Sequence, residues 1–302
     1  MPLDPQVVSY LARLRELGVR PASELPLELA RDGYDSGAAA LFGPVDEVES
    51  VEDLDAAGVP VRVFRPGSEA SAPAVVYLHG GGWVIGGLES HQPLCQTLAA
   101  RSGCAVIAVD YRRAPEHPYP AAIEDAWAVV RWAAERFSPL AVAGDSAGGQ
   151  LAASAALRAR DSGVRLALQV LVYPATDHPG SAAAYGTVGE GTTLNGEQMW
   201  WFWSQYLVDE ARAGDPDCSP LRAPDVSALP PALILTAEYD PLHAEGEAYG
   251  ARLREAGVAV TVQQYEGLVH GFIRMPGVLD RASDAIDDVA AAIAAALIPA
   301  RL

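Results

Sequence analysis

The chain has 302 residues, half of them hydrophobic, so it can bury a large core, and one α/β domain with an insertion fits as well as two small domains. Its formal net charge of −18 argues against binding to nucleic acid or to an anionic membrane surface, because both would repel it. The basic residues are all arginine, which together with the abundant alanine indicates a biased genomic composition.

The N-terminal part is expected to form helices, and two strands follow. Apolar residues recur at helical spacing in Pro5–Leu17, and a second helical stretch runs from Pro26 to Phe42. The period then changes, because Val45–Leu54 and Val59–Phe64 alternate like paired strands. Ala57-Gly58 lies between these two runs and is expected to form the turn that joins them.

From residue 74 onward, short apolar strands alternate with helices. The expected strands are Ala74–Leu78, Ala105–Val109, Leu140–Ala143, Leu166–Tyr173, Ala232–Thr236 and Val258–Gln264. The expected helices are Leu88–Ser102, Ala121–Arg136, Ala147–Asp161, Pro241–Ala256 and Arg281–Leu297. Repeated alternation of this kind predicts an α/β fold with a doubly wound, mostly parallel sheet and helices on both faces.

One long stretch, from Asp177 to Pro231, breaks this alternation because it contains no convincing strand. It carries a dense aromatic helix with Trp200, Trp201, Phe202, Trp203 and Tyr206. We interpret the stretch as an insertion between two strands of the sheet. Its aromatic side chains are expected to contribute to the core and, with the N-terminal helices, to roof a site at this edge of the sheet.

Two glycine-rich segments, each placed after an apolar run, carry the chemistry. Residues 144–148 read G-D-S-A-G, the G-x-S-x-G turn that exposes a nucleophilic serine between a strand and a helix in α/β-hydrolases. Residues 79–83 read H-G-G-G-W, the loop that gives such a serine its oxyanion hole. Either segment alone could be an ordinary glycine-rich turn. Together and in this order they predict acyl transfer through an ester of Ser146.

A serine hydroxyl needs a neighbouring base, and only a histidine suits this arrangement. The chain has six histidines: His79, His91, His117, His178, His243 and His270. The first three precede the serine, which contradicts the order serine, acid, histidine found in α/β-hydrolases. His178 lies in the insertion and His243 in the first turn of a helix. His270 follows the last expected strand between flexible glycines, so it is the predicted base.

The acid that orients the base is expected between the serine and His270, at the end of a strand. Asp240 meets both conditions, because it follows the apolar run 232–235 closely and precedes a proline that suits a helix start. Asp240 could also serve as the helix N-cap, which Asp favours. Glu238 is the alternative acid. Asp177 also follows a strand, but it comes too early and opens the insertion.

Charge that develops on the substrate oxygen needs fixed N–H donors. Gly81 and Gly82 allow their backbone amides to turn toward that oxygen, and the amide of Ala147 supplies a third donor. His79 is expected to brace this loop by hydrogen bonds and to take no part in the chemistry.

With these motifs in place, the chain resembles the hormone-sensitive-lipase family of bacterial carboxylesterases, the branch with a GDSAG nucleophile motif. The resemblance rests on HGGGW at 79–83, DYRRAPEHPYPAAIED at 110–125, GDSAGG at 144–149, and the AEYDPL and GLVHGF segments around Asp240 and His270. These segments span most of the chain. The segment at 110–125 reads physically as a salt-bridged, hydrogen-bonded brace.

The resemblance implies an α/β-hydrolase fold with a catalytic triad of Ser146, Asp240 and His270 and an oxyanion hole at Gly81, Gly82 and Ala147. It implies N-terminal cap helices over residues 1–43 and a catalytic domain over 44–302 with a helical cap insertion at about 177–231. The implied activity is hydrolysis of short- to medium-chain carboxylic esters without a cofactor. A homodimer is also compatible with it.

One departure stands beside the acid, where relatives commonly read DPLRDEG and this chain reads DPLHAEG at 240–246. A charged pair is therefore missing, which affects the expected packing and pH response of this loop. Two other functions stay open. An amidase or lactonase would use the same triad, and a small-molecule-binding protein could occupy a degenerate hydrolase scaffold. The presence of His270 favours an enzyme, because a receptor would be free to lose it.

Cysteine and histidine spacing argue against a metal site. Cys95, Cys104 and Cys218 are expected to be buried free thiols, and no pair of His or Cys has zinc-ligand spacing. Residues 1–17 lack the pattern of a secretory signal, and no apolar run is long enough to span a bilayer. We therefore expect a cytoplasmic protein that needs no metal or organic cofactor.

Overall fold

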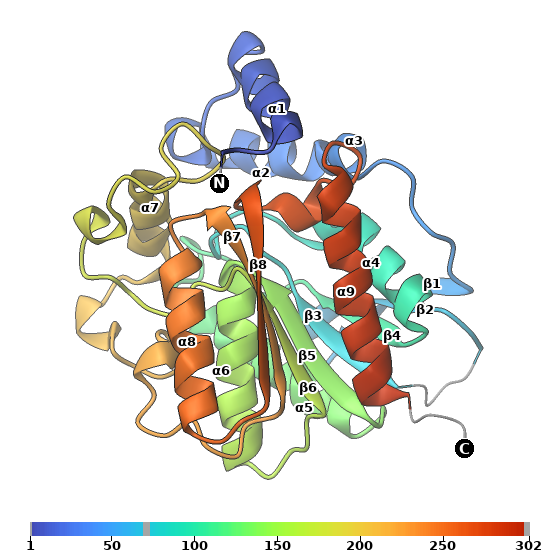
Figure 1. Ribbon diagram of the computed structural model, residues 1–302. Coiled ribbons are helices and arrows are strands. Elements are labelled where there is room, and N and C mark those ends of the chain that lie inside the picture. Colours follow the sequence, from blue (N-terminus) through green and yellow to red (C-terminus); the bar gives the residue numbers. More distant parts are fainter. Residues whose placement is uncertain (1, 69–72, 299–302) are drawn as a thin grey trace.

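A single twisted sheet of eight strands forms the centre of the computed structural model, which describes residues 2–68 and 73–298 (Figure 1). The strands are β1 (Ser50–Ala56), β2 (Val59–Arg65), β3 (Ala74–Leu78), β4 (Ala105–Val109), β5 (Leu140–Asp145), β6 (Leu168–Val172), β7 (Ala232–Tyr239) and β8 (Val260–Val269). Their order in the sheet is β1-β2-β4-β3-β5-β6-β7-β8. Strand β2 runs antiparallel to β1 and β4, and the other neighbouring strands pair in parallel, so the prediction of a mostly parallel sheet is confirmed.

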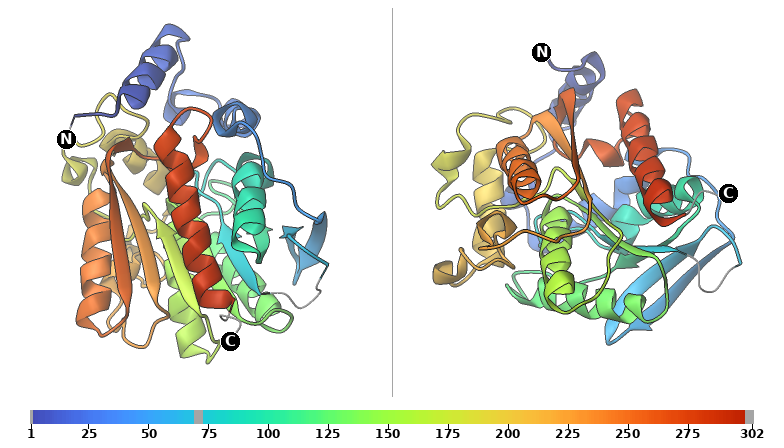
Figure 2. Two further views of the ribbon diagram at one scale, coloured as in Figure 1. Left: turned by 45° about the vertical axis from the view of Figure 1, so that its right-hand side comes forward. Right: turned by 60° about the horizontal axis from the view of Figure 1, so that its bottom comes forward.

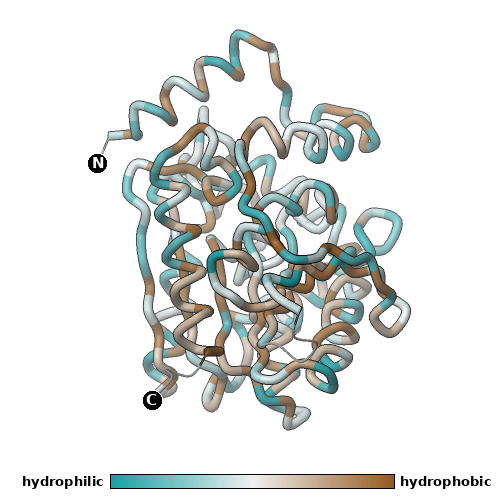
Figure 3. Tube along the Cα trace, turned by 90° about the vertical axis from the view of Figure 1, so that its right-hand side faces the viewer, coloured by the Kyte–Doolittle hydropathy of each residue, from teal (hydrophilic) through white to brown (hydrophobic). Residues whose placement is uncertain are grey.

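Helices cover both faces of this sheet (Figures 1 and 2). The α-helices are α1 (Pro5–Glu16), α2 (Leu27–Ser36), α3 (Ala38–Phe42), α4 (Leu88–Ser102), α5 (Ala121–Ala134), α6 (Ala147–Asp161), α7 (Gly196–Tyr206), α8 (His243–Glu255) and α9 (Asp280–Leu297). Hydrophobic and hydrophilic residues alternate along many of these helices, as expected when one side of a helix faces a core (Figure 3).

Two hydrophobic cores lie on opposite faces of the sheet. The side chains of β3 alternate between the two cores. Val76 and Leu78 pack in the core formed with α5, α6 and α8, whereas Val75 and Tyr77 pack in the core formed with α4 and α9. This alternation follows from the two-residue period of a strand, and both faces are apolar because helices cover both. The parallel strands consequently end at one common edge, where the loops that follow them meet.

Three of the expected elements illustrate how their boundaries differ from those in the structure. The helix expected over Pro26–Phe42 is two helices, α2 and α3, which meet at Gly37. Strand β1 begins at Ser50 rather than Val45, and most of its residues are exposed, so the apolar signal in that region is weak. Strand β8 continues to Val269 rather than ending at Gln264, because it stays paired with β7 through a register shift.

The N-terminal helices and α7 lie beyond the carboxyl ends of the parallel strands (Figure 1). Arg31 of α2 attaches the N-terminal segment there, since its guanidinium donates to the carbonyls of Val84 and Ala114 at 2.9 and 3.0 Å and pairs with Glu116 at 2.7 Å. Helix α7 belongs to the long connection between β6 and β7. Among the described residues, no helix combines the length and apolarity that crossing a membrane requires.

Candidate active site

Ser146 stands at the sharp turn between β5 and α6. Its φ of 56° is unusual for a residue other than glycine, and it leaves the side chain at the carboxyl edge of the sheet. The turn tolerates no bulk on either side. A Cβ on Gly144 would overlap the backbone of Gly148, and a Cβ on Gly148 would overlap the carbonyl of Leu78. The two motif glycines are therefore required by the close approach of β3 to this turn.

The structure brings His270 and Asp240 to this serine from two other strand ends. His270 follows β8 directly, and its Nε2 lies 2.9 Å from the Oγ of Ser146. Asp240 follows β7 directly, and its Oδ2 lies 2.7 Å from Nδ1 of the same imidazole. The other carboxylate oxygen of Asp240 accepts the N–H of Leu242 at 2.8 Å, which fixes the carboxylate plane. A serine, an imidazole and a carboxylate in this order can transfer an acyl group.

Two further neighbours contact His270, one at its ring and one at its backbone. The ring of Tyr173 packs against the ring of His270 at a centroid distance of 4.5 Å. Thr193, in the insertion between β6 and β7, donates its hydroxyl to the carbonyl of His270 at 2.7 Å. Neither residue was expected from the sequence, because no local pattern reports contacts between segments 77 or more residues apart.

The predicted oxyanion donors lie in the tight loop after β3 and at the first residue of α6. Within residues 2–68 and 73–298, the amides of Gly81, Gly82 and Ala147 have no hydrogen-bond acceptor. A Cβ on Gly81 would overlap the carbonyl of Ile85, and one on Gly82 would overlap the ring of Phe202. Since Phe202 belongs to α7, the insertion rests directly on this loop.

Trp83 anchors the end of the same loop. Its indole N–H donates to Oε1 of Gln150 on α6 at 2.9 Å. Its ring stacks on Tyr206 of α7 at 4.3 Å with an interplanar angle of 8°, and it also packs against Trp203. The loop after β3 is thus held between α6 and the aromatic helix of the insertion.

The remaining histidines lie away from the Ser146 hydroxyl or face other partners. His79 is buried beneath the loop, where its Nδ1 lies 2.8 Å from the carbonyl of Gly80 and its ring stacks on Tyr111 at 4.1 Å. Burial lowers the pKa of His79 well below its ordinary value, so the ring is neutral. His178 packs against Trp203 in the insertion, and His243 is the first residue of α8.

The alternative acid, Glu238, is directed elsewhere. Its carboxylate accepts the N–H of Gly267 at 2.7 Å. Asp177 pairs with Arg222, also away from the imidazole. A further acid, Glu245 on α8, accepts the N–H of Thr176 at 2.7 Å, and its removal from water raises the pKa of that carboxyl well above its ordinary value. These carboxylates tie the loops of this edge together.

The segment at 110–125 forms the brace that its sequence suggests. The carboxylate of Asp125 accepts the backbone N–H of Arg112 at 2.8 Å and pairs with the guanidinium of the same residue at 2.7 Å. Arg113 pairs more loosely with Asp110 at 3.8 Å. These bonds shape the connection between β4 and α5 without reaching Ser146.

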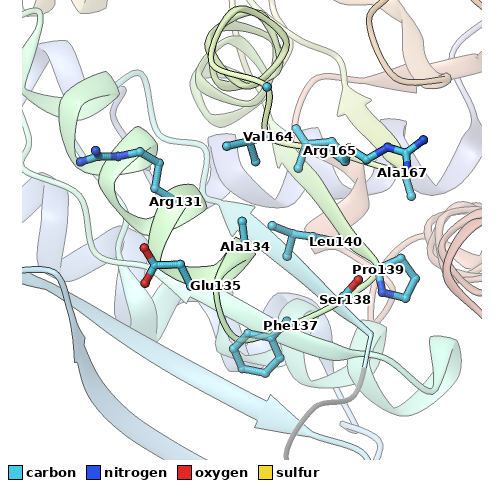
Figure 4. Close-up of a pocket in the computed structure, with 12 residues that line it drawn as sticks. Arg131, Ala134, Glu135, Phe137, Ser138, Pro139, Leu140, Val164, Arg165 and Ala167 are labelled. Atoms are coloured by element: carbon cyan, nitrogen blue, oxygen red, sulfur yellow. The ribbon is translucent and has the colours of Figure 1, made fainter.

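In the described part of the chain, no cluster of three His, Cys, Asp or Glu residues could hold a metal ion. All three cysteines are buried free thiols, and burial raises the pKa of Cys104 to about 11 and that of Cys218 to about 12. An open cleft of about 700 Å³ lies near the amino ends of β5 and β6, lined by residues of 131–140 and 163–167 (Figure 4). It contains no residue of the candidate site.

Comparison with known proteins identifies the family of the chain. A family model described as the alpha/beta hydrolase fold matches residues 75–274, two thirds of the chain. The chain belongs to the α/β-hydrolase fold family. An ethyl acetate hydrolase of Pseudomonas putida is 38% identical over 95% of this α/β-hydrolase and 96% of its own length. The carboxylic ester hydrolase LipN of Mycobacterium tuberculosis is 39% identical over 90% of this chain and 77% of its own length.

Solved structures give the same result. The hyperthermophilic esterase of the archaeon Pyrobaculum calidifontis superimposes on this α/β-hydrolase with a TM-score of 0.91 at 38% identity, covering 97% of this chain and 98% of the other. The similarity extends over nearly the whole length of both chains. The resemblance to bacterial carboxylesterases indicated by the sequence motifs is confirmed.

Proposed function

We propose that the protein is a serine carboxylesterase that hydrolyses short- to medium-chain carboxylic esters through an acyl-enzyme on Ser146. The observation that carries the proposal is the unbroken chain Ser146–His270–Asp240, with contacts of 2.9 and 2.7 Å, beside three backbone amides without an acceptor in the described residues. The names of the relatives support ester hydrolysis, and one of them is an ethyl acetate hydrolase.

In the proposed mechanism each group has one role. Oγ of Ser146 attacks the ester carbonyl while Nε2 of His270 takes its proton, and Asp240 stabilises the imidazolium that forms. The amides of Gly81, Gly82 and Ala147 stabilise the negative oxygen of the tetrahedral intermediate. The imidazolium then protonates the departing alcohol. A water molecule, deprotonated by the same imidazole, releases the acid and restores Ser146.

The cap is part of the proposal. The proposed cap comprises residues 1–43, described from residue 2 onward, and the insertion at about 177–231. Its described part lies over the carboxyl edge of the sheet and would close over the acyl group. Contacts of the insertion with both halves of the site support this, since Phe202 rests on Gly82 and Thr193 holds the carbonyl of His270. Deletion of the N-terminal helices should change the chain-length preference more than it unfolds the sheet. A cytoplasmic location and a homodimer remain predictions.

Amide or lactone hydrolysis would use the same triad, and a degenerate scaffold would bind a small molecule without turnover. A panel of chromogenic esters of rising acyl length, run beside matching anilides, separates these functions. We expect turnover of esters with about four to eight carbons in the acyl chain and little turnover of anilides. Ser146→Ala should reduce ester turnover by ~10⁴- to 10⁶-fold. A wild-type protein that hydrolyses neither series would favour the binding function.

A further inference from the structure

A second hydrogen-bonded serine–histidine–aspartate chain lies beneath the candidate site. Asp145, which precedes Ser146, is buried with 2% of its surface exposed, and His91 of α4 is buried with 1% exposed. Nε2 of His91 lies 3.2 Å from Oδ1 of Asp145. Nδ1 of His91 lies 3.0 Å from Oγ of Ser90. Because these groups are buried beneath the loop, they have no access to substrate, and their function has to be sought in what they hold.

The carboxylate of Asp145 holds the loop that carries the oxyanion donors. It accepts the backbone N–H of Gly80 at 3.0 Å and the hydroxyl of Tyr77 at 2.9 Å. A Cβ on Gly80 would overlap this carboxylate, so the contact needs a glycine there. Gly80 directly precedes Gly81 and Gly82. The carboxylate therefore fixes the backbone of Gly80, and the two donor amides belong to the next two residues of the chain.

The protonation state of the imidazole follows from its partners. Nε2 of His91 lies 3.2 Å from the carboxylate of Asp145 and 3.3 Å from the amide nitrogen of Gly80. We assign the ring proton to Nε2, because a lone pair facing the carboxylate would be repelled by it. Burial lowers the pKa of His91, which favours the neutral ring. Nδ1 is then left without a proton, 3.0 Å from Oγ of Ser90, whose hydroxyl also donates to the carbonyl of Gly87 at 3.0 Å. The ring of His91 thus links the N-terminal turn of α4 to the carboxylate of Asp145.

The negative charge of a buried carboxylate would disfavour the formation of an oxyanion nearby unless a positive charge compensates for it. Arg274, which is buried four residues after His270, supplies such a charge, and its guanidinium stacks on Tyr34 at 3.9 Å and donates to the carbonyl of Ser90 at 3.2 Å. Burial raises the pKa of Asp145, but His91, Arg274 and Tyr77 together lower it to a greater extent, so the group is ionised.

We propose that Asp145 and His91 are positioning residues that orient the oxyanion loop through the N–H of Gly80. This proposal rests on the esterase function above. Donor amides lower the barrier only when they point at the developing charge, and small displacements of such groups reduce rates strongly. Asp145→Asn keeps an oxygen that can accept the N–H of Gly80, but it removes the charge. Its NH₂ group would also face the N–H of His91, which places two donors against each other. His91→Phe keeps the ring and removes both nitrogen contacts.

Both variants are to be compared with the wild type on a butyrate ester, after titration of active sites with a fluorophosphonate. We expect kcat per titrated site to fall by about 10- to 100-fold with KM within about twofold. Affinity for a trifluoromethyl ketone, which forms a tetrahedral adduct, should weaken in parallel. Asp125→Asn is the matched control, because Asp125 also holds a backbone amide and an ionised partner but lies outside the loop. It should lower the melting temperature without changing kcat.

Unchanged kcat and ketone affinity in a folded Asp145→Asn protein would overturn the proposal, as would an equal loss in the Asp125 control. If neither variant folds, ¹⁵N NMR of the wild-type histidines decides, and a His91 ring protonated at Nδ1 alone would contradict the proposed chain. Failure of the esterase function itself would look different, because the wild type would then be inactive or Ser146→Ala would be active.

Discussion

The hydroxyl of Thr193 donates to the carbonyl of His270 at 2.7 Å, which joins the insertion to the loop of the proposed base. Thr193 lies before α7, in the connection between β6 and β7, whereas His270 follows β8 at the end of the sheet. The insertion is therefore attached to the candidate site by a specific hydrogen bond as well as by aromatic packing. Removal of this hydrogen bond should be detectable in the rate of ester turnover.

Thr193→Val tests this attachment. The substitution keeps the shape of the side chain and removes one hydrogen bond, which contributes about 0.5–1.5 kcal/mol. We expect kcat/KM for a short ester to fall by about 2- to 10-fold, because the imidazole is held less firmly. Thr261→Val, at an exposed position of β8, is the control and should behave like the wild type. Equal activity of both variants would show that the bond has no role in turnover.

Asp240→Asn and Glu238→Gln together identify the acid. Asp240→Asn should reduce turnover by ~10⁴-fold, because the imidazole then adopts the wrong tautomer and its cation loses its partner. Glu238→Gln should have a much smaller effect, since that carboxylate accepts the N–H of Gly267 instead. Steady-state kinetics on one ester compares the two directly. The reverse ranking would make Glu238 the acid.

The ion pair between Arg31 and Glu116 predicts a pH-dependent attachment of α2. The hydrogen bonds from Arg31 lower the pKa of Glu116 to about 2, below its value in an unfolded chain of about 4.3. The stabilisation is therefore present above pH 4.3 and is lost as the pH falls toward 2. Half of the Glu116 side chain is exposed, so the pair contributes no more than about 1 kcal/mol.

Thermal unfolding of Glu116→Gln measures this contribution. At pH 7 the variant should melt about 2–4 °C below the wild type at most, and the difference should shrink as the pH falls below 4.3. Glu255→Gln, at an exposed position of α8, is the control and should follow the wild type throughout. A difference that grows on acidification would contradict the proposed linkage.

Activity is expected to be independent of metal ions. The groups at the carboxyl edge have roles in the triad, the oxyanion hole or the surrounding hydrogen bonds, and the proposed mechanism needs no Lewis acid. Prolonged dialysis against EDTA should leave more than about nine tenths of the rate, because no step uses a metal. A stoichiometric metal whose removal abolishes turnover would overturn this prediction.

The meeting of three side chains in the candidate site could be predicted from the sequence, because each of them follows the end of a strand. Ser146 comes one residue after β5, Asp240 one residue after β7 and His270 one residue after β8. Short apolar runs are visible in a sequence, and parallel strands end at a common edge, so the three residues were expected to meet.

The supporting contacts could not be predicted in the same way. His91 lies on a helix 54 residues before Asp145, and its neighbours along the chain give no sign that it faces a carboxylate. Arg274 is charged, and a charged residue in a loop is usually exposed, yet it is buried here. The motif residue Asp145 was the available signal, because a charged side chain within a tightly packed turn requires buried partners.

The central claim, that Ser146 is the acylated nucleophile, is tested most directly by peptide mass spectrometry after reaction with a fluorophosphonate. We expect one label per chain, on the tryptic or chymotryptic peptide that contains Ser146, with loss of ester hydrolysis in proportion to labelling. The Ser146→Ala protein should remain folded and unlabelled. A label on another residue, or hydrolysis that persists in a fully labelled protein, would contradict the account.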